Sequence, residues 1–196
     1  MDSEILLTVV KIIGIYLLAD FAGGLFHWSE DTLGADDTPV WGPLFAAPNS
    51  LHHSQPSAMN RIHWLKNNAP LFALAAAVVL IAWALGKLTW EVWLFAILGG
   101  FNQQAHRFAH GARLRLPRVI LFLQRIHFLQ DARHHWRHHT PPYTCSYCVL
   151  TPWLNPVLDI LGFWRLMDRL FVPLIGAPRR PDLKDKPWYR DRPIWA

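Results

Sequence analysis

The sequence predicts an all-α integral membrane protein with about three transmembrane helices and amphipathic interfacial helices that carry a histidine-rich metal site. Three observations lead to this prediction. Hydrophobic residues make up 52% of the 196 residues and charged residues only 17%, whereas a soluble domain has about 25% charged residues. Three apolar stretches have the length of membrane-spanning helices. Nine of the eleven histidines lie in four groups near the ends of those stretches.

The three candidate spans are residues 5–25, 69–85 and 88–104. Lys11 and Asp20 interrupt the first, whereas the second is uncharged throughout. Helices of 17 to 21 residues reach about 26 to 31 Å, which matches the hydrocarbon core of a bilayer. The alternative is that the second and third stretches form a buried hairpin of a soluble protein.

The remaining chain is expected to be soluble or interfacial. The segment 31–68 is rich in Pro, Asn and Ser and predicts an ordered loop region. The segments 117–139 and 152–175 mix apolar with basic residues, which suits amphipathic helices at a membrane surface. We therefore expect one domain over residues 1–175, followed by an extended tail over 176–196.

The basic residues predict the membrane topology. With three spans, most of them fall on one side, and the formal net charge of +5 therefore reports orientation rather than nucleic-acid binding. We expect the N-terminus outside and the C-terminus in the cytoplasm of a bacterial cell, with the metal site on the cytoplasmic side of the cytoplasmic membrane. The residues that set this bias are Arg61, Lys66, Arg107, Arg113, Arg115, Arg118, Arg125, Arg133 and Arg137.

The four histidine groups also lie on that one side, because they follow span one, precede span two or follow span three. Side chains four residues apart share a helix face, so two imidazoles with this spacing can reach one ion. His27 and Asp31 have the same spacing, which adds a carboxylate. The candidate metal ligands are His27, Asp31, His52, His53, His106, His110, His134, His135, His138 and His139.

Ligand type and number restrict the metal. Imidazole suits zinc, copper, iron and nickel, whereas the two cysteines are too few for a zinc–thiolate site or a disulfide framework. The candidates exceed the four ligands of one zinc ion, so we expect two metal ions of higher coordination number, with iron the leading choice. One or two candidates then lie outside the coordination shells, His52 and His134 first among them.

Three further residues bear on the site. Asp20 lies two turns before His27 and is expected to orient an imidazole through its outer nitrogen. His63 stands alone beside Trp64, and a surface or interfacial role is expected. For His127, coordination, support of a ligand and packing all remain open.

The order and spacing of several motifs resemble one known family. These motifs are Asp20-x-x-x-Gly24-x-x-His27-Trp28, Asp31-Thr32-x-Gly34, His52-His53-x-x-Pro56, Gln104-x-His106-x-x-x-His110, Leu116-Pro117-Arg118, His134-His135-x-x-His138-His139, Tyr147-Cys148, Trp153-Leu154-Asn155-Pro156 and Gly162-Phe163-Trp164-Arg165. Together they resemble the Kua, or plasmanylethanolamine desaturase, family, which includes a plastid palmitate desaturase. The chain departs from the family pattern around the ligands, at Asn49-Ser50-Leu51, Gln55, Ile62, Gln103 and Tyr143.

The resemblance implies a non-haem di-iron centre that uses O2 and external electrons to remove two hydrogens from a lipid chain. It also implies a membrane lipid substrate and an electron donor such as ferredoxin or cytochrome b5, with a plasmanylethanolamine-type reaction foremost. Two alternatives stay open: a di-iron hydroxylase of fatty acyl chains or lipids, which shares the first hydrogen abstraction, and a non-catalytic metal-binding membrane protein.

Overall fold

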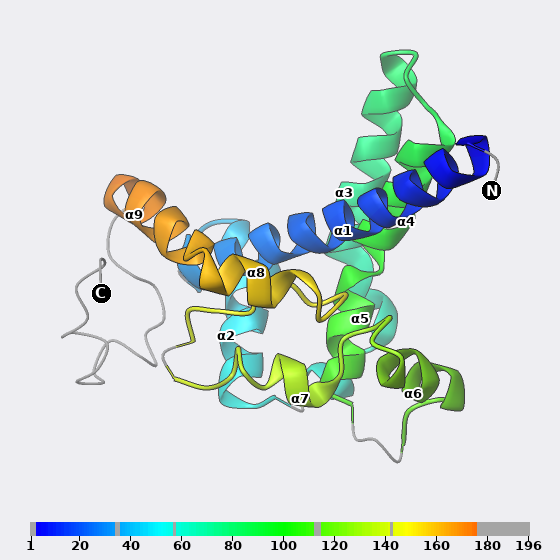
Figure 1. Cartoon of the computed structure of the whole chain (residues 1–196). Coiled ribbons are helices and arrows are strands. Elements are labelled where there is room, and N and C mark those ends of the chain that lie inside the picture. Colours follow the sequence, from blue (N-terminus) through cyan, green and yellow to red (C-terminus); the bar gives the residue numbers. More distant parts are fainter. Residues whose placement is uncertain (1–2, 34–35, 57, 112–114, 142, 176–196) are drawn as a thin grey trace.

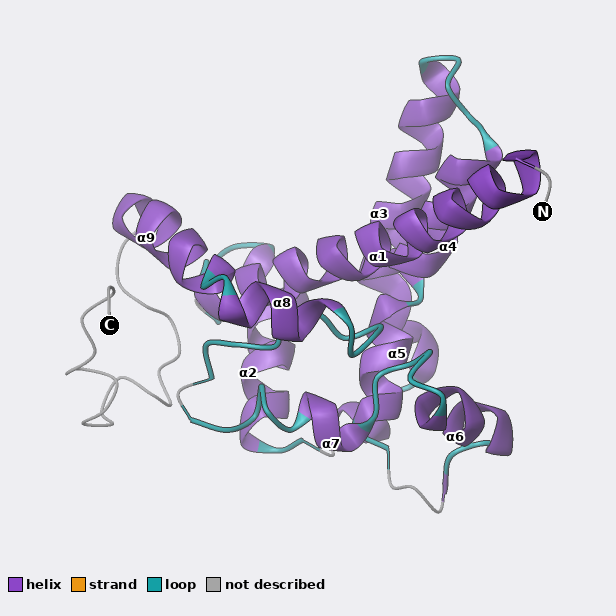
Figure 2. Cartoon of the chain, in the orientation of Figure 1, coloured by secondary structure: helices purple, strands orange, loops and turns teal. Residues whose placement is uncertain are grey.

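The computed structural model describes residues 3–33, 36–56, 58–111, 115–141 and 143–175 (Figure 1). Every regular element in these ranges is helical, and none of their residues forms a strand (Figure 2). The predicted all-α class is therefore confirmed. The predicted tail over 176–196 lies outside the described residues.

The first helix, α1 (Ser3–Thr32), divides into two halves with different surroundings. Apolar side chains such as Leu6 and Val10 are exposed along the N-terminal half, whereas Asp20 and His27 are buried in the C-terminal half. At 30 residues the helix is about 45 Å long, which exceeds the hydrocarbon core of a bilayer. One half is therefore suited to lipid, and the other is covered by protein.

Helices α3 (Trp64–Ala84) and α4 (Trp90–Gly100) form a hairpin that packs on α1 (Figure 1). Gly86 makes the turn at a φ of +65°, which favours glycine because it has no Cβ. A Cβ added at Gly100 would lie 3.2 Å from the Phe72 ring, so the two helices approach closely.

Among the described helices, two are long and apolar enough to cross a membrane, α1 and α3. The predicted third span is not one continuous helix, because α4 ends at Gly100 and α5 (Asn102–Ala109) begins after a break at Phe101. The 11 residues of α4 reach only about 16 Å. Gly99 and Gly100 weaken the helix, and the Asn102 amide bonds the Ala19 carbonyl at 3.1 Å.

The predicted loop over 31–68 is wrong, because much of this segment is helical. It contains a π-helical turn η1 (Gly42–Ala46), helix α2 (Ala47–Ser54) and a 3₁₀ turn η2 (Ala58–Arg61). Two of the four prolines in this segment, Pro43 and Pro48, lie in the first turns of η1 and α2. A missing N–H is tolerated at that position, so proline starts a helix there.

The predicted amphipathic helix over 117–139 is also wrong. The chain forms α6 (Arg118–Arg125), turns at His127 with a φ of 58°, and forms the single turn α7 (Ala132–His135). The segment 152–175 is likewise two helices, α8 (Leu154–Ile160) and α9 (Phe163–Ile175). In Figure 1, α6 and α7 lie below α1, as do α2 and α5, whereas α8 and α9 pack against α1 itself.

Candidate metal centre

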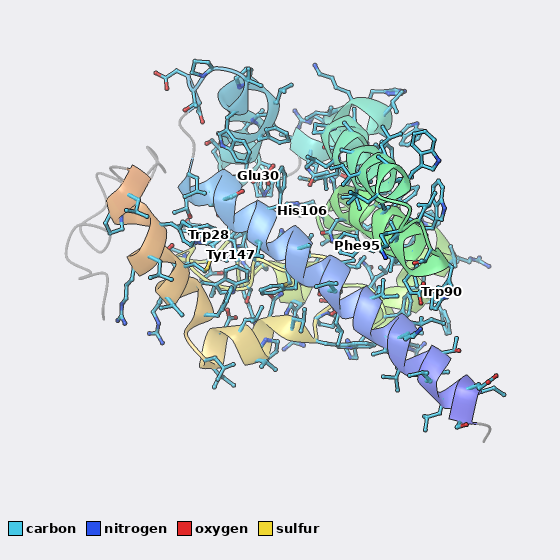
Figure 3. The ribbon with its side chains drawn as sticks, turned by 90° about the horizontal axis from the view of Figure 1, so that it is seen from above. Trp28, Glu30, Trp90, Phe95, His106 and Tyr147 are labelled. Carbon is cyan, nitrogen blue, oxygen red and sulfur yellow. The ribbon has the colours of Figure 1, made fainter. Side chains whose placement is uncertain are left out.

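Nine of the ten predicted ligands converge in two neighbouring groups, and the donor atoms of each group lie within 4.8 Å of one another. All are buried except His110, which is half-buried. His106 lies close beside the C-terminal half of α1 (Figure 3). The first group is His52, His106, His110, His135 and His139, and the second is His27, Asp31, His53 and His138.

In the first group, the Nε2 atoms of His106, His110, His135 and His139 lie close together. The Nε2 of His135 lies 2.9 Å from that of His106, 2.9 Å from that of His110 and 3.1 Å from that of His139. Nitrogens bound to one metal at about 2.1 Å lie about 3.0 Å apart at a right angle and about 3.4 Å apart in a tetrahedron. The spacing therefore fits donors of one ion with more than four ligands.

In the second group, the Asp31 carboxylate joins two histidines. Its Oδ1 lies 3.0 Å from His53 Nε2, its Oδ2 lies 3.3 Å from His138 Nε2, and these two nitrogens are 3.1 Å apart. The groups adjoin, because the rings of His27 and His106 have centroids 4.8 Å apart. Two metal-sized sites therefore lie side by side.

The protonation of these histidines fits metal binding. Burial and the neighbouring imidazoles lower the pKa of His52, His106 and His135 well below the usual range, and burial lowers that of His110 to about 3. A metal binds neutral imidazole, so these four histidines need no further deprotonation at pH 7. Within the described part of the chain, both ring nitrogens of His52 and the Nε2 of His27 are buried without a hydrogen-bond partner. A metal ion would satisfy the one lone pair that each neutral ring offers.

Comparison with known proteins agrees with this geometry. The sequence profile of the lipid desaturase domain matches residues 16–182. The chain belongs to the lipid desaturase family. The family resemblance and the predicted desaturase function are thereby confirmed, and desaturases are oxidoreductases.

Three relatives are desaturases by name. The chain is 33% identical to plasmanylethanolamine desaturase 1 of Mus musculus, over 91% of this chain and 70% of that protein. It is 32% identical to plasmanylethanolamine desaturase of Myxococcus xanthus, over 86% and 62%. It is 31% identical to the chloroplastic fatty acid desaturase 4 of Arabidopsis thaliana, over 91% and 56%. No solved structure matches the chain.

In this desaturase, a segment without helix or strand over residues 145–151, here called the carbonyl segment, orients two of the histidines. The Nδ1 of His27 donates to the Tyr147 carbonyl at 3.0 Å, and the Nδ1 of His138 donates to the Cys145 carbonyl at 2.9 Å. A hydrogen bond at Nδ1 leaves the Nε2 lone pair directed into the site. The Tyr147 side chain packs beside α1, near Trp28 (Figure 3).

Buried polar side chains hold the carbonyl segment. Asp20 accepts from the backbone N–H groups of Leu150 and Thr151 at 2.8 and 3.2 Å. The Asn155 amide bonds both backbone groups of Cys148, and the Gln130 amide donates to the Cys148 carbonyl at 2.8 Å. Sequence reasoning missed Gln130 and the role of Asn155, although Asn155 lies in a family motif.

The prediction that Asp20 orients an imidazole is therefore wrong. Seven residues separate it from His27, which is about 10 Å along a helix and too far for a hydrogen bond. Asp20 instead supports His27 indirectly. It accepts a hydrogen bond from the backbone of the carbonyl segment, and the Tyr147 carbonyl of that segment accepts from His27.

His134 and His138 also have the four-residue spacing that predicts a pair on one helix face, and this prediction is wrong as well. Helix α7 ends at His135, and the N–H of His138 bonds the His135 carbonyl, so the chain winds more tightly than an α-helix. His134 turns away from both groups, with its Nε2 3.4 Å from the Asn155 amide. His63 caps α3 and is exposed, as expected, and His127 is an exposed turn residue outside both groups.

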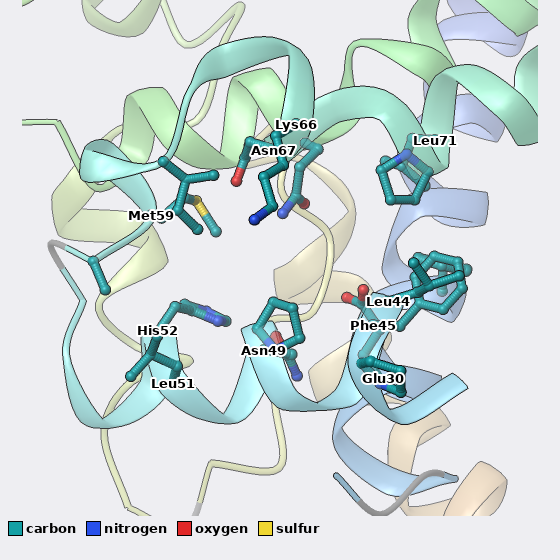
Figure 4. Close-up of a pocket in the computed structure, with 17 residues that line it drawn as sticks. Glu30, Leu44, Phe45, Asn49, Leu51, His52, Met59, Lys66, Asn67 and Leu71 are labelled. Carbon is teal, nitrogen blue, oxygen red and sulfur yellow. The ribbon is translucent and has the colours of Figure 1, made fainter. Parts of the chain in front are cut away.

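Two hollows reach the donor groups. An apolar chamber of about 150 Å³ lies between α1, α2 and α3, and His52 forms part of its wall (Figure 4). A larger hollow of about 640 Å³, here called the arginine hollow, is bordered by His110, His135 and Trp136. The chamber is lined by residues that include Phe26, Glu30, Phe45, Lys66 and Leu71, and the arginine hollow by residues that include Arg61, Arg107 and Arg115.

Proposed function

We propose that this chain is a di-iron membrane desaturase that introduces a double bond into an alkyl or acyl chain of a membrane lipid, using O2 and external electrons. The observation that carries the proposal is the pair of adjoining donor groups, built from eight imidazoles and one carboxylate. The close Nε2 spacing of the first group favours a coordination number above four, which suits iron better than zinc.

The first group would hold one iron and the second group the other, so the proposed ligands are the nine predicted residues other than His134. Iron bound there would supply the activation of O2 and the removal of hydrogen from the lipid. In the balanced reaction, a lipid CH2–CH2 unit, O2, two electrons and two protons yield CH=CH and two waters. The carbonyl segment orients the imidazoles of His27 and His138. The surrounding protein keeps bulk water from the site, because eight of the nine donors are buried.

The apolar chamber supports a lipid substrate. Its lining includes His52 and residues of α1 and α3, the two described helices that are long and apolar enough to cross a membrane. Most of the chamber lining is apolar, which suits the hydrocarbon chain of a lipid. A plasmanylethanolamine-type reaction is the foremost candidate, because two of the relatives are named for it.

The electrons would arrive at the arginine hollow. Ferredoxin and cytochrome b5 are the donors expected from the family resemblance, and both are acidic redox proteins. Arg61, Arg107 and Arg115 present positive charge beside His110 and His135, and such complementarity steers a charged partner. An integral protein of a bacterial cytoplasmic membrane, with this hollow on the cytoplasmic side, satisfies the positive-inside bias.

Lipid profiling of cells with and without the protein tests this function, combined with metal analysis of the purified chain. We expect a lipid product that has lost two hydrogens and about two iron ions per chain. A product that has gained one oxygen would make the protein a hydroxylase. One zinc ion with negligible iron would contradict the di-iron proposal.

A further inference from the structure

The lining of the apolar chamber includes two side chains of opposite charge, Glu30 and Lys66. Glu30 is near the C-terminal end of α1, and Lys66 is in the first turn of α3. The two helix ends lie on the side of the molecule that holds the donor groups (Figure 1). In Figure 4, Glu30 and His52 approach the chamber from one side and Lys66 and Asn67 from the other. Most of the remaining lining is apolar.

These polar groups are not satisfied by one another. Within the described residues, the Glu30 carboxylate and the Lys66 ammonium group have no ion pair or hydrogen bond. The Asn67 Nδ2 is buried and also has no hydrogen-bond partner there. The chamber therefore offers one acceptor of positive charge and two donors for negative charge.

Such an arrangement costs free energy unless a ligand completes it. The cost falls on the buried Asn67 amide, which has no partner, whereas Glu30 is half-buried and Lys66 is exposed. The charge pattern requires a ligand that has both a cationic and an anionic group. The apolar wall requires that the same ligand have a hydrocarbon portion, which indicates an amphipathic zwitterion.

We propose that the chamber binds the headgroup of a zwitterionic phospholipid, with the ammonium group at Glu30 and the phosphate at Lys66 and Asn67. This inference rests on the proposed function, because it identifies the lipid class that the same site would accept. Glu30 and Lys66 are then specificity residues, and they hold the first carbons of the lipid chain beside His52. Glu30 and Lys66 lie near the ends of α1 and α3, the two candidate spans. The ends of a membrane span lie at the depth of the lipid headgroups.

The experiment compares lipids that have identical chains and different headgroups. The purified iron-loaded protein is placed in vesicles that contain ethanolamine or glycerol phospholipids, with the chain that lipid profiling identifies. The two measurements are the ratio of turnover on the two lipids and the ratio of the two lipids retained by the protein in native mass spectrometry. The test variants are Glu30→Gln and Lys66→Met, and iron content is measured for each.

A matched control removes the same charges elsewhere. Lys11 and Glu91 form a 3.0 Å ion pair between α1 and α4, far along α1 from the donor groups. Lys11→Met and Glu91→Gln repeat the two chemical changes without altering the chamber. We expect both headgroup ratios to equal those of the unaltered protein in these controls.

We expect the unaltered protein to prefer the ethanolamine lipid, and Glu30→Gln to reduce that preference about tenfold in both measurements, with iron retained. Lys66→Met should weaken retention of both lipids, because both contain phosphate. An unchanged ratio in Glu30→Gln, or equal retention of the two lipids by the unaltered protein, would overturn the inference. Retention does not require turnover. A protein that retains ethanolamine lipid through Glu30 but desaturates no lipid would therefore refute the proposed function and leave the headgroup site standing.

Discussion

The direction of an imidazole depends on the group that binds its outer nitrogen. For His27 and His138 that group is a backbone carbonyl of the carbonyl segment, at 3.0 and 2.9 Å. Because a carbonyl can only accept, each ring carries its proton on Nδ1 and offers Nε2 to a metal. The side chains that hold this backbone therefore influence the metal site without touching it.

Asp20 is the residue at which this indirect role is testable. Asp20→Asn replaces one of the two oxygens that accept from the backbone of Leu150 and Thr151. We expect a loss of about 1 to 3 kcal/mol in stability, because one buried N–H is left unsatisfied, together with partial loss of iron. Thermal unfolding and metal analysis measure the two effects. Full iron content with unchanged stability would show that the carbonyl segment is held without Asp20.

Removal of a donor has a direct effect. His106→Ala and His135→Ala each delete a nitrogen whose neighbours lie 2.9 Å away, so we expect both to lower iron content. Activity should fall more than about 100-fold, since changes to groups behind the ligands alone cost about 10- to 100-fold. His63→Ala is the control, because His63 caps α3 at the surface. Loss of iron in that variant would mean that the donor set is incomplete.

At the level of elements, the sequence predicts long apolar helices well and short polar ones poorly. Long apolar stretches predict α1 and α3, because a helix is the conformation in which such a stretch satisfies its backbone hydrogen bonds within a bilayer. The sequence predicts a loop at α2, because Pro, Asn and Ser are typical of turns, whereas Pro48 in fact lies in the first turn of this helix. The carbonyl segment has no periodicity, and its conformation depends on distant residues such as Asp20 and Gln130. The donor set was largely predictable, because imidazoles gathered at one membrane face have few other roles.

The early end of α7 separates two histidines that sequence spacing had paired. His138 lies in the second donor group, whereas His134 lies outside both and faces Asn155. We therefore expect His134→Ala to retain most of its iron and His138→Ala to lose about half. Metal analysis of the two variants, purified side by side, distinguishes them. Equal loss in both would indicate that His134 turns into the site when metal binds.

At the level of the whole molecule, the donor groups constrain the topology. His27 follows the apolar part of α1, His52 precedes α3, and His106 lies in α5, and all three meet. The chain must therefore return through α4 and α5 to the side from which α3 departs, although α4 alone is too short to span a bilayer. We predict an outside N-terminus and a cytoplasmic C-terminus. Reporter fusions after Ser3, at Lys87 and at Ala196 should read outside, outside and inside, and an outside signal at Ala196 would contradict this topology.

The same placement predicts where the double bond forms. Two donors, His27 and Asp31, lie near the C-terminal end of α1, so bound metals would lie near the membrane interface rather than at its midplane. In a bilayer the carbons next to the glycerol backbone lie at that depth, and a lipid held by its headgroup presents them first. We therefore expect an ether or acyl chain that has lost two hydrogens close to the headgroup, on an otherwise intact lipid. Mass spectrometry locates the bond, and acid treatment separates a labile vinyl ether from a stable acyl alkene. A bond in the middle of the chain would show that a tunnel delivers distant carbons to the metals, and the depth argument would then fail.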